Sequence, residues 1–216
     1  MDPFRLCLAL GPIAVYLLLL GGINLHRRPL VVSGARDAAA LGLALSGVVI
    51  VGPLELFMPV AAAINFGSFV WVLLIALYGM VLAALLLLQR PRLVIYNLTS
   101  GELRPVLAEL VRDLDPEARW AGDSVSLPGL GVQLFLEDVP AMRNVSLVAT
   151  HGRQDYQGWR KLESSLGRAL EELAVQRNPR GLSLLVAGSL LVGLLVLLVS
   201  RNPDAVAQSL SQLFTR

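Results

Sequence analysis

The sequence has few of the residues from which catalytic and metal sites are built. Among its 216 residues it holds one cysteine, Cys7, and two histidines, His26 and His151. A single cysteine excludes a disulfide within the chain and a zinc site made of several cysteines. The phosphate-binding motifs GxGxxG and GxxxxGK[ST] do not occur. We therefore expect no cofactor and no metal, and an enzyme is the less favoured interpretation, although the sequence leaves it open.

Charge is scarce as well. Charged residues make up 16% of the chain, whereas 55% of the residues are hydrophobic. A soluble domain is usually about 45–50% apolar and about a quarter charged, so this composition indicates a membrane protein with one polar domain. The net charge of +2 is too small to indicate a nucleic-acid partner. Lys161 is the only lysine beside many arginines, which is typical of GC-rich coding and favours a bacterial source.

Four apolar runs are long enough to cross a bilayer, which takes about 20 residues of helix. They cover residues 6–25, 38–60, 69–89 and 182–200. We expect the first run to stay uncleaved, because the only small-residue cleavage candidate, SGA at 33–35, lies too far beyond it.

The arginines predict the orientation of these spans. They flank the first and third connections, whereas the second connection, AAAINFGS, has no charge. Because arginine-rich connections stay in the cytoplasm, the first and third connections should both be cytoplasmic. We expect a multi-pass protein of the bacterial inner membrane with both termini outside and residues 91–180 in the cytoplasm. The arginines concerned are Arg27, Arg28, Arg36, Arg90, Arg92, Arg177 and Arg180.

One carboxylate, Glu55, falls inside the second apolar run, in the stretch GPLELFMP. It lies about 26 Å of helix beyond Ala38, in a hydrocarbon core about 30 Å thick. This depth favours a position near the outer interface, where the side chain is hydrated or paired. The alternative is a carboxylate that handles an ion or a substrate, since ionisable groups in membranes are often functional. Pro53, two residues earlier, is expected to bend the helix.

Small and polar residues near the span centres are expected to pack the helices together. Hydroxyl groups can form a polar layer between helices, and glycines let two backbones approach closely. The candidates are Tyr16, Gly42, Ser46, Tyr78, Gly188 and Ser189.

Residues 91–180 have a different composition, with most of the charged residues of the chain. Thr99 and Glu102 have the spacing of a capping box before an amphipathic helix over 100–114. A second amphipathic helix is expected over 156–175, with Trp159 in its apolar stripe. Alternating apolar residues predict strands at 92–98, 118–127, 131–139 and 145–152.

The predicted fold is an α-helical membrane protein of four transmembrane helices. An α+β domain of order β-α-β-β-β-α is inserted between the third and fourth helices. The expected domains are 1–90, a three-helix region; 91–180, the cytosolic domain; and 181–216, a fourth span with a short amphipathic C-terminal helix.

A polar stretch, HGRQDYQGWRK at 151–161, is the candidate contact surface of the domain. It mixes basic and aromatic side chains, which partner interfaces favour. Its candidate residues are His151, Arg153, Tyr156, Arg160 and Lys161.

Two functions from different classes follow from these patterns. The favoured one is a non-catalytic membrane protein whose cytosolic domain binds or assembles a protein partner, or self-associates, at the lipid bilayer. The alternative is a small oligomeric transporter or channel subunit that uses Glu55. An intramembrane or lipid-modifying enzyme comes third, because no acid/base pair is recognisable.

Overall fold

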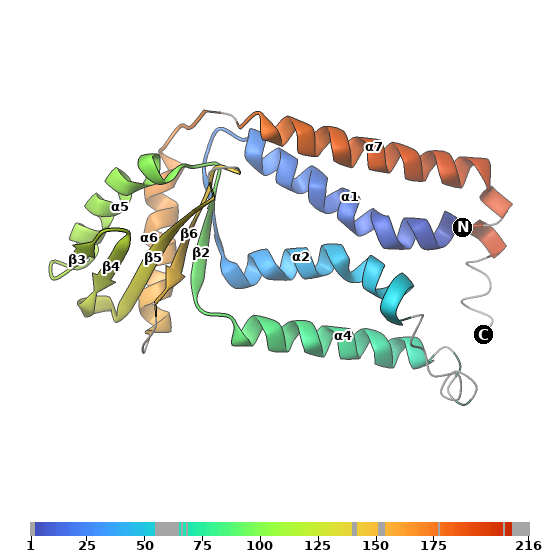
Figure 1. Cartoon of the computed structure of the whole chain (residues 1–216), viewed down its shortest axis with the longest axis horizontal. Helices are drawn as coiled ribbons and strands as arrows, with labels where there is room; N and C mark the ends of the chain where they lie inside the picture. Colours follow the sequence, from blue (N-terminus) through green and yellow to red (C-terminus); the bar gives the residue numbers. More distant parts are fainter. Residues whose placement is uncertain are drawn as a thin grey trace. The chain divides into compact units, whose positions relative to one another are not determined.

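A computed structural model (Figure 1) describes residues 3–54, 65, 67, 69–139, 142–150, 154–176, 178–204 and 206–208. The chain divides into two compact units, which we describe separately. The helical unit comprises Met1–Leu20, Ala39–Leu88 and Ser183–Arg216, and the module comprises Gly21–Ala38 and Gln89–Leu182.

Four long apolar helices run through the described part of the chain. They are α1 (Pro3–Leu25), α2 (Gly34–Val49), α4 (Phe69–Leu88) and α7 (Arg180–Arg201). Each is long and apolar enough to cross a membrane, α2 with its extension to Gly52, which confirms the four predicted apolar helices.

The second helix changes its winding before its end. A π-helical turn, η1 (Ile50–Leu54), follows α2 directly and contains Pro53. Proline has no N–H to donate, so the α-helical hydrogen-bond pattern cannot continue through it. A π turn thus lies at Pro53, where a bend was expected.

The module contains an antiparallel sheet of six strands among the described residues, in the order β1-β2-β6-β5-β4-β3. The strands are β1 (Leu30–Ser33), β2 (Arg92–Tyr96), β3 (Arg119–Ala121), β4 (Ser124–Leu127), β5 (Val132–Val139) and β6 (Asn144–Ala149). A 3-10 turn, η2 (Pro128–Leu130), joins β4 to β5.

Two amphipathic helices, α5 (Ser100–Leu114) and α6 (Tyr156–Glu171), complete the module (Figure 1). The predicted bounds of α5 are confirmed. Thr99 accepts a hydrogen bond from the backbone N–H of Glu102, and the Glu102 carboxylate accepts one from the backbone N–H of Thr99. This reciprocal capping satisfies two donors that the first turn of a helix leaves open.

The sheet differs from the expected order β-α-β-β-β-α in two ways. Residues 118–127 form a two-stranded hairpin, because Gly122 adopts φ +63° and reverses the chain between β3 and β4. The first connection supplies a further strand, β1, which pairs antiparallel with β2 from Leu30↔Tyr96 to Ser33↔Leu93. The second helix, expected to reach residue 175, ends at Glu171.

The core of the module lies between one face of the sheet and the two helices. Leu103 and Leu107 of α5 and Leu162 and Leu166 of α6 are fully buried against the inward side chains of the strands. Trp159 is 5% exposed and belongs to this core, as its place in the apolar stripe predicted. Its indole Nε1 donates to Gln154 Oε1 at 3.1 Å, which satisfies its one polar group.

Candidate functional site: a polar junction at the helix ends

Three buried asparagines meet inside the module where the long helices end. Asn24 lies in the last turn of α1, Asn97 follows β2, and Asn178 precedes α7; they are 1%, 0% and 2% exposed. A buried amide is costly unless it forms hydrogen bonds, so the partners of these side chains show what the junction holds together.

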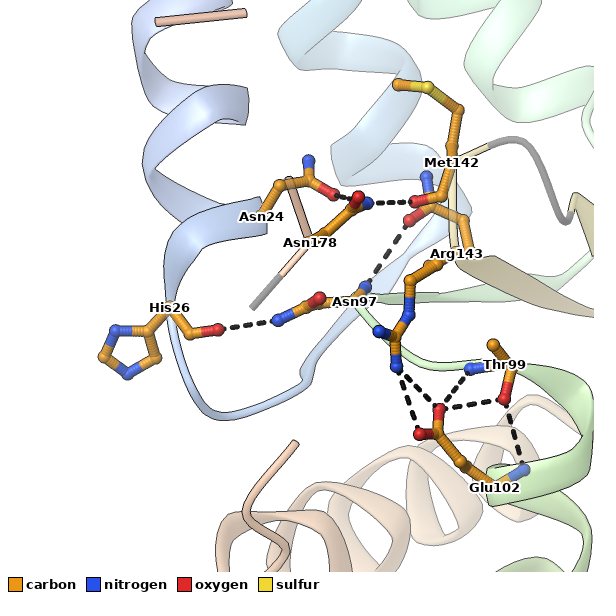
Figure 2. A network of polar contacts seen from close by, with 9 residues as sticks. Asn24, His26, Asn97, Thr99, Glu102, Met142, Arg143 and Asn178 are labelled. Carbon is orange, nitrogen blue, oxygen red and sulfur yellow. Dashed lines mark hydrogen bonds and ion pairs between the residues drawn. The ribbon is translucent and has the colours of Figure 1, made fainter. Parts of the chain in front are cut away.

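Asn178 connects three segments. Its Nδ2 donates to Asn24 Oδ1 at 3.1 Å and to the carbonyl oxygen of Met142 at 3.0 Å (Figure 2). Its Oδ1 accepts from the backbone N–H of Arg180 at 3.1 Å, in the first turn of α7, as the side chain of an N-cap residue does. One amide thus links the end of α1, the β5–β6 connection and the start of α7.

Backbone bonds reinforce the link between α1 and the segment before α7. The backbone N–H of Asn178 donates to the carbonyl of Asn24 at 3.1 Å, and that of Val175 donates to Arg27 at 2.9 Å. A Cβ on Gly181 would lie 2.9 Å from Asn24 Cβ, so glycine permits this close approach. The two chain segments are therefore in direct contact over several residues.

Asn97 connects β2 to the residues after α1. It has a positive φ of +63°, which asparagine tolerates better than most residues. Its Nδ2 donates to the carbonyl oxygen of His26 at 2.6 Å (Figure 2). Its Oδ1 is buried and finds no hydrogen-bond partner among the described residues.

Glu102 and Arg143 extend the polar network to α5. Arg143 Nη2 donates to Glu102 Oε1 at 3.1 Å and to Oε2 at 3.0 Å, and Thr99 donates to Oε2 through its backbone and its hydroxyl. Burial raises the pKa of Glu102, but the hydrogen bonds from Thr99 and Arg143 and the charge of Arg143 outweigh it, so the pKa is lowered.

A second contact inside the module fixes the start of α2. Asp37, in the first turn of α2, accepts a hydrogen bond from Tyr96 Oη and pairs with Arg92 Nη2 at 3.3 Å. Gly34 is buried under the Arg92 side chain, and a Cβ there would collide with it. The start of α2 is therefore held against β2.

The chemistry of the junction suits attachment better than reaction. Amide side chains neither titrate nor act as nucleophiles at neutral pH, so Asn24, Asn97 and Asn178 form bonds that hold segments in place. In the described part of the chain no group of three or more His, Cys, Asp or Glu residues has the arrangement of a metal site.

The described residues of the predicted contact surface lie outside the junction. Glu55, on which a transport role would depend, and His151 and Arg153 lie outside the described residues. Tyr156 begins α6 and is 71% exposed, and Arg160 and Lys161 are exposed on the same helix. None of these three side chains belongs to the junction as described.

The six residues expected to pack the helices occupy different environments. Tyr78 Oη donates to the carbonyl oxygen of Gly42 at 2.6 Å, and a Cβ on Gly42 would lie 2.6 Å from Leu82 Cδ1. A Cβ on Gly188 would lie 2.9 Å from Leu18 Cδ2, which brings α7 close to α1.

The remaining three are less enclosed. Ser46 Oγ donates to the carbonyl of Leu43 in its own helix at 2.7 Å, Tyr16 is half-buried, and Ser189 is exposed. Contacts between helices thus include those of Gly42, Tyr78 and Gly188.

Most of the junction was not predicted from the sequence. Asn178 carried a local signal, since Asn-Pro before an apolar run is typical of a helix start. Asn24 and Asn97 each end a regular element, which is a weak signal for a cap. Their partners lie far away in the sequence: the bond between Asn24 and Asn178 spans 154 positions.

No family model, no curated protein and no solved structure matches this chain. The contacts within the two units are therefore what supports a function.

Proposed function

We propose that this chain is a non-catalytic, multi-pass membrane protein whose module binds a protein partner at the membrane surface. The observation that carries the proposal is the pairing of β1 with β2, which joins the first connection to the sheet built by the third. Both connections thereby fold as one module. The chain enters or leaves this module at four helices, so the module is tethered at four points.

The attachments of the module support this role. The chain passes from β1 into α2 without a linker, and three residues, 89–91, separate α4 from β2. The ends of α1 and α7 are tied together by Asn24 and Asn178. A module tethered in this way loses less orientational freedom when a partner binds, and preorganisation of this kind raises affinity.

We further propose that the module is cytoplasmic, in a bacterial inner membrane with both termini outside. The β1–β2 pairing supports one part of this proposal, a shared side for the first and third connections, because both contribute strands to one sheet. Arg27, Arg28, Arg36 and Arg180 are exposed on the module, and arginine favours the cytoplasmic side. The proposed domains remain 1–90, 91–180 and 181–216, with residues 21–38 added to the module.

Site-specific photo-crosslinking in intact cells tests the partner. A photoreactive amino acid is placed at Tyr156, Phe135 or Trp120, which are 71%, 42% and 39% exposed on the module. The control position is Leu190, which is 69% exposed on α7. We expect a discrete protein adduct from at least one module position and none from the control. Adducts from no module position would contradict the proposal.

Labelling of a single cysteine tests the orientation separately. In a Cys7→Ser background, Ala121→Cys places a thiol at an exposed position of β3, next to the β3–β4 turn. A membrane-impermeant maleimide should label it only after the inner membrane is permeabilised. Labelling in intact spheroplasts would place the module outside.

A further inference from the structure

A groove runs along the edge of the module between α5 and β3. It has a volume of about 490 Å³, and its walls include Arg104, Ala108 and Arg112 of α5 and Trp120 of β3. The groove is open to solvent along one side of the sheet. It is separate from the junction at the helix ends.

The α5 wall has a regular pattern. Arg104, Ala108 and Arg112 are spaced four residues apart and so lie along one face of the helix. The two arginines are about 12 Å apart along the helix axis, at 1.5 Å per residue. The small side chain of Ala108 leaves a shallow floor between two cationic ends.

The β3 wall is the edge of the sheet. In the described part of the chain β3 pairs only with β4, and all three of its residues are exposed. Trp120 is opposite Val125, a core residue, so its ring lies on the face that α5 covers. The free edge offers backbone N–H and C=O groups, which are a template for another strand.

The direction of α5 relative to β3 also favours an extended ligand. Arg104, near the start of α5, pairs with Asp123 in the β3–β4 turn, whereas the end of α5 leads into β3 within four residues. The helix and the strand therefore run side by side in opposite directions. A strand added to β3 would lie parallel to the row formed by Arg104, Ala108 and Arg112.

The groove has an arginine at each end, and one of the two is shared with a carboxylate of the module. Arg112 is exposed, and the Arg104 side chain is 49% exposed although it pairs with Asp123. The one acidic wall residue, Asp115, is 3% exposed and accepts hydrogen bonds from the backbone N–H groups of Glu117 at 3.0 Å and Gly129 at 2.7 Å. Its carboxylate is thus bonded inside the module. Arg112 is exposed at one end of the groove, and at the other end Arg104 can exchange Asp123 for a carboxylate of a ligand.

We propose that this groove binds an extended acidic segment of the partner protein, which adds to the sheet along β3. Side chains at positions i, i+2 and i+4 of a strand share one face, and i and i+4 are about 13 Å apart. Carboxylates at i and i+4 then reach Arg104 and Arg112, and an apolar residue at i+2 rests on Ala108 and Trp120. The inference rests on the proposed function, because it names the chemistry of the partner.

Peptide binding to the intact protein tests the spacing. The protein is held in an uncharged maltoside detergent, and binding of the fluorescein-labelled peptide GSESVSESG is followed by anisotropy. The control peptide GSEESVSSG has the same composition with adjacent glutamates. We expect saturable binding of the first peptide, and binding of the control weaker by about tenfold, which is about 1.4 kcal/mol.

Variants of the groove test the residues. Arg104→Glu and Arg112→Glu should each weaken binding by about tenfold, because each leaves a peptide carboxylate facing a like charge. Asp123→Asn should strengthen binding, since it removes the carboxylate that competes for Arg104. The matched control is Arg119→Glu, the same charge change on the opposite face of β3, where Arg119 is opposite Ser126.

The outcomes separate this inference from the proposed function. If Arg119→Glu and Arg112→Glu weaken binding equally, the peptide is held by general charge attraction, and the proposal that it binds in the groove is wrong. Absence of binding to the wild-type protein would also overturn it. If adducts from Tyr156 or Phe135 persist in that case, the partner binds elsewhere on the module and only the groove fails. Arg112→Gln replaces Arg112→Glu if charge reversal lowers the melting temperature of the module.

Discussion

The two units of the chain bury their apolar residues in opposite ways. Among the described residues, 25 apolar side chains are buried, and only Ala14, Ala44, Val70 and Leu195 of them lie in the helical unit. The helical unit has the more apolar composition, yet its leucines and valines are mostly exposed. The module has fewer apolar residues and buries them between sheet and helices.

The difference is what the proposed membrane location of the helical unit predicts. In water, apolar side chains gain free energy by leaving the solvent, so the module sorts them inward. Lipid tails are as apolar as leucine, so burial offers no such gain and helices in a bilayer associate through close packing and hydrogen bonds. This contrast makes each unit sensitive to a different kind of substitution.

The largest effect is expected from a cavity in the module. Leu166→Ala removes a fully buried side chain of α6 and should lower the free energy of unfolding by about 2–5 kcal/mol. Leu190→Ala, at a 69% exposed position of α7, should change it by less than about 0.5 kcal/mol. Pulse proteolysis of the module in increasing urea measures the first variant, and unfolding of the helices in mixed maltoside and dodecyl sulfate micelles measures the second. Equal effects would mean that the two units share one pattern of burial.

The next effect concerns the junction. Asn178→Ala removes the hydrogen bonds to the carbonyl of Met142, to Asn24 Oδ1 and from the N–H of Arg180, and should cost about 1–3 kcal/mol. Asn202 is the matched control, because it stands in the same Arg-Asn-Pro sequence but is exposed after α7. The same proteolysis assay applies. A loss in Asn202→Ala as large as in Asn178→Ala would contradict a specific role of the junction.

Close packing in the helical unit gives a third comparison. At Gly188 even a Cβ would lie only 2.9 Å from Leu18 Cδ2, so Gly188→Leu should cost about 1–3 kcal/mol through overpacking. Gly193→Leu is the control, since nothing lies within 4 Å of a Cβ at that position. Unfolding of the helices in mixed maltoside and dodecyl sulfate micelles measures the difference. Similar curves for the two variants would remove the proposed packing role of Gly188.

The smallest effect is expected at Glu102. Since its folded pKa is lowered below the usual 4.5, the ionised form stabilises the module above pH 4.5, and this contribution is lost as the pH falls through the folded pKa. Glu102→Gln keeps an oxygen that can accept the hydrogen bonds of Thr99 but removes the charge paired with Arg143, so it should cost about 0.5 kcal/mol at pH 7. The gap between wild type and variant should close toward pH 3.

The control for this prediction is Glu109→Gln, the same change at an exposed position of α5. Thermal unfolding at a series of pH values measures both variants. A gap that stayed constant between pH 7 and pH 3 would show that the charge of Glu102 is not responsible.

Residues within or next to an element predicted that element where its hydrogen bonds join residues close together in the sequence. The bounds of α5 follow from Thr99 and Glu102 at its start and from Asp115 at its end, all within a few residues of the helix. The four long helices were readable because their apolar runs are long. The π turn at Pro53 also has a local cause.

Elements that depend on distant partners were not predictable in this way. β1 has only four residues, LVVS, between Pro29 and Gly34, and its partner β2 lies beyond α2 and α4. Its β-branched pair Val31-Val32 was the available signal, but a strand so short is decided by the edge that receives it. The partners of Asn24 and Asn97 depend on the same long-range folding, and so does the groove beside β3.

The place of β1 at one edge of the sheet sets an order for biogenesis. As the ribosome makes the chain, β1 emerges before α2, and its partner β2 emerges only after α4. Until two more hydrophobic segments have left the ribosome, β1 has no strand to pair with. If α2 and α4 cross a membrane as proposed, completion of the sheet is coupled to their insertion, and a failure of insertion leaves β1 without its partner strand.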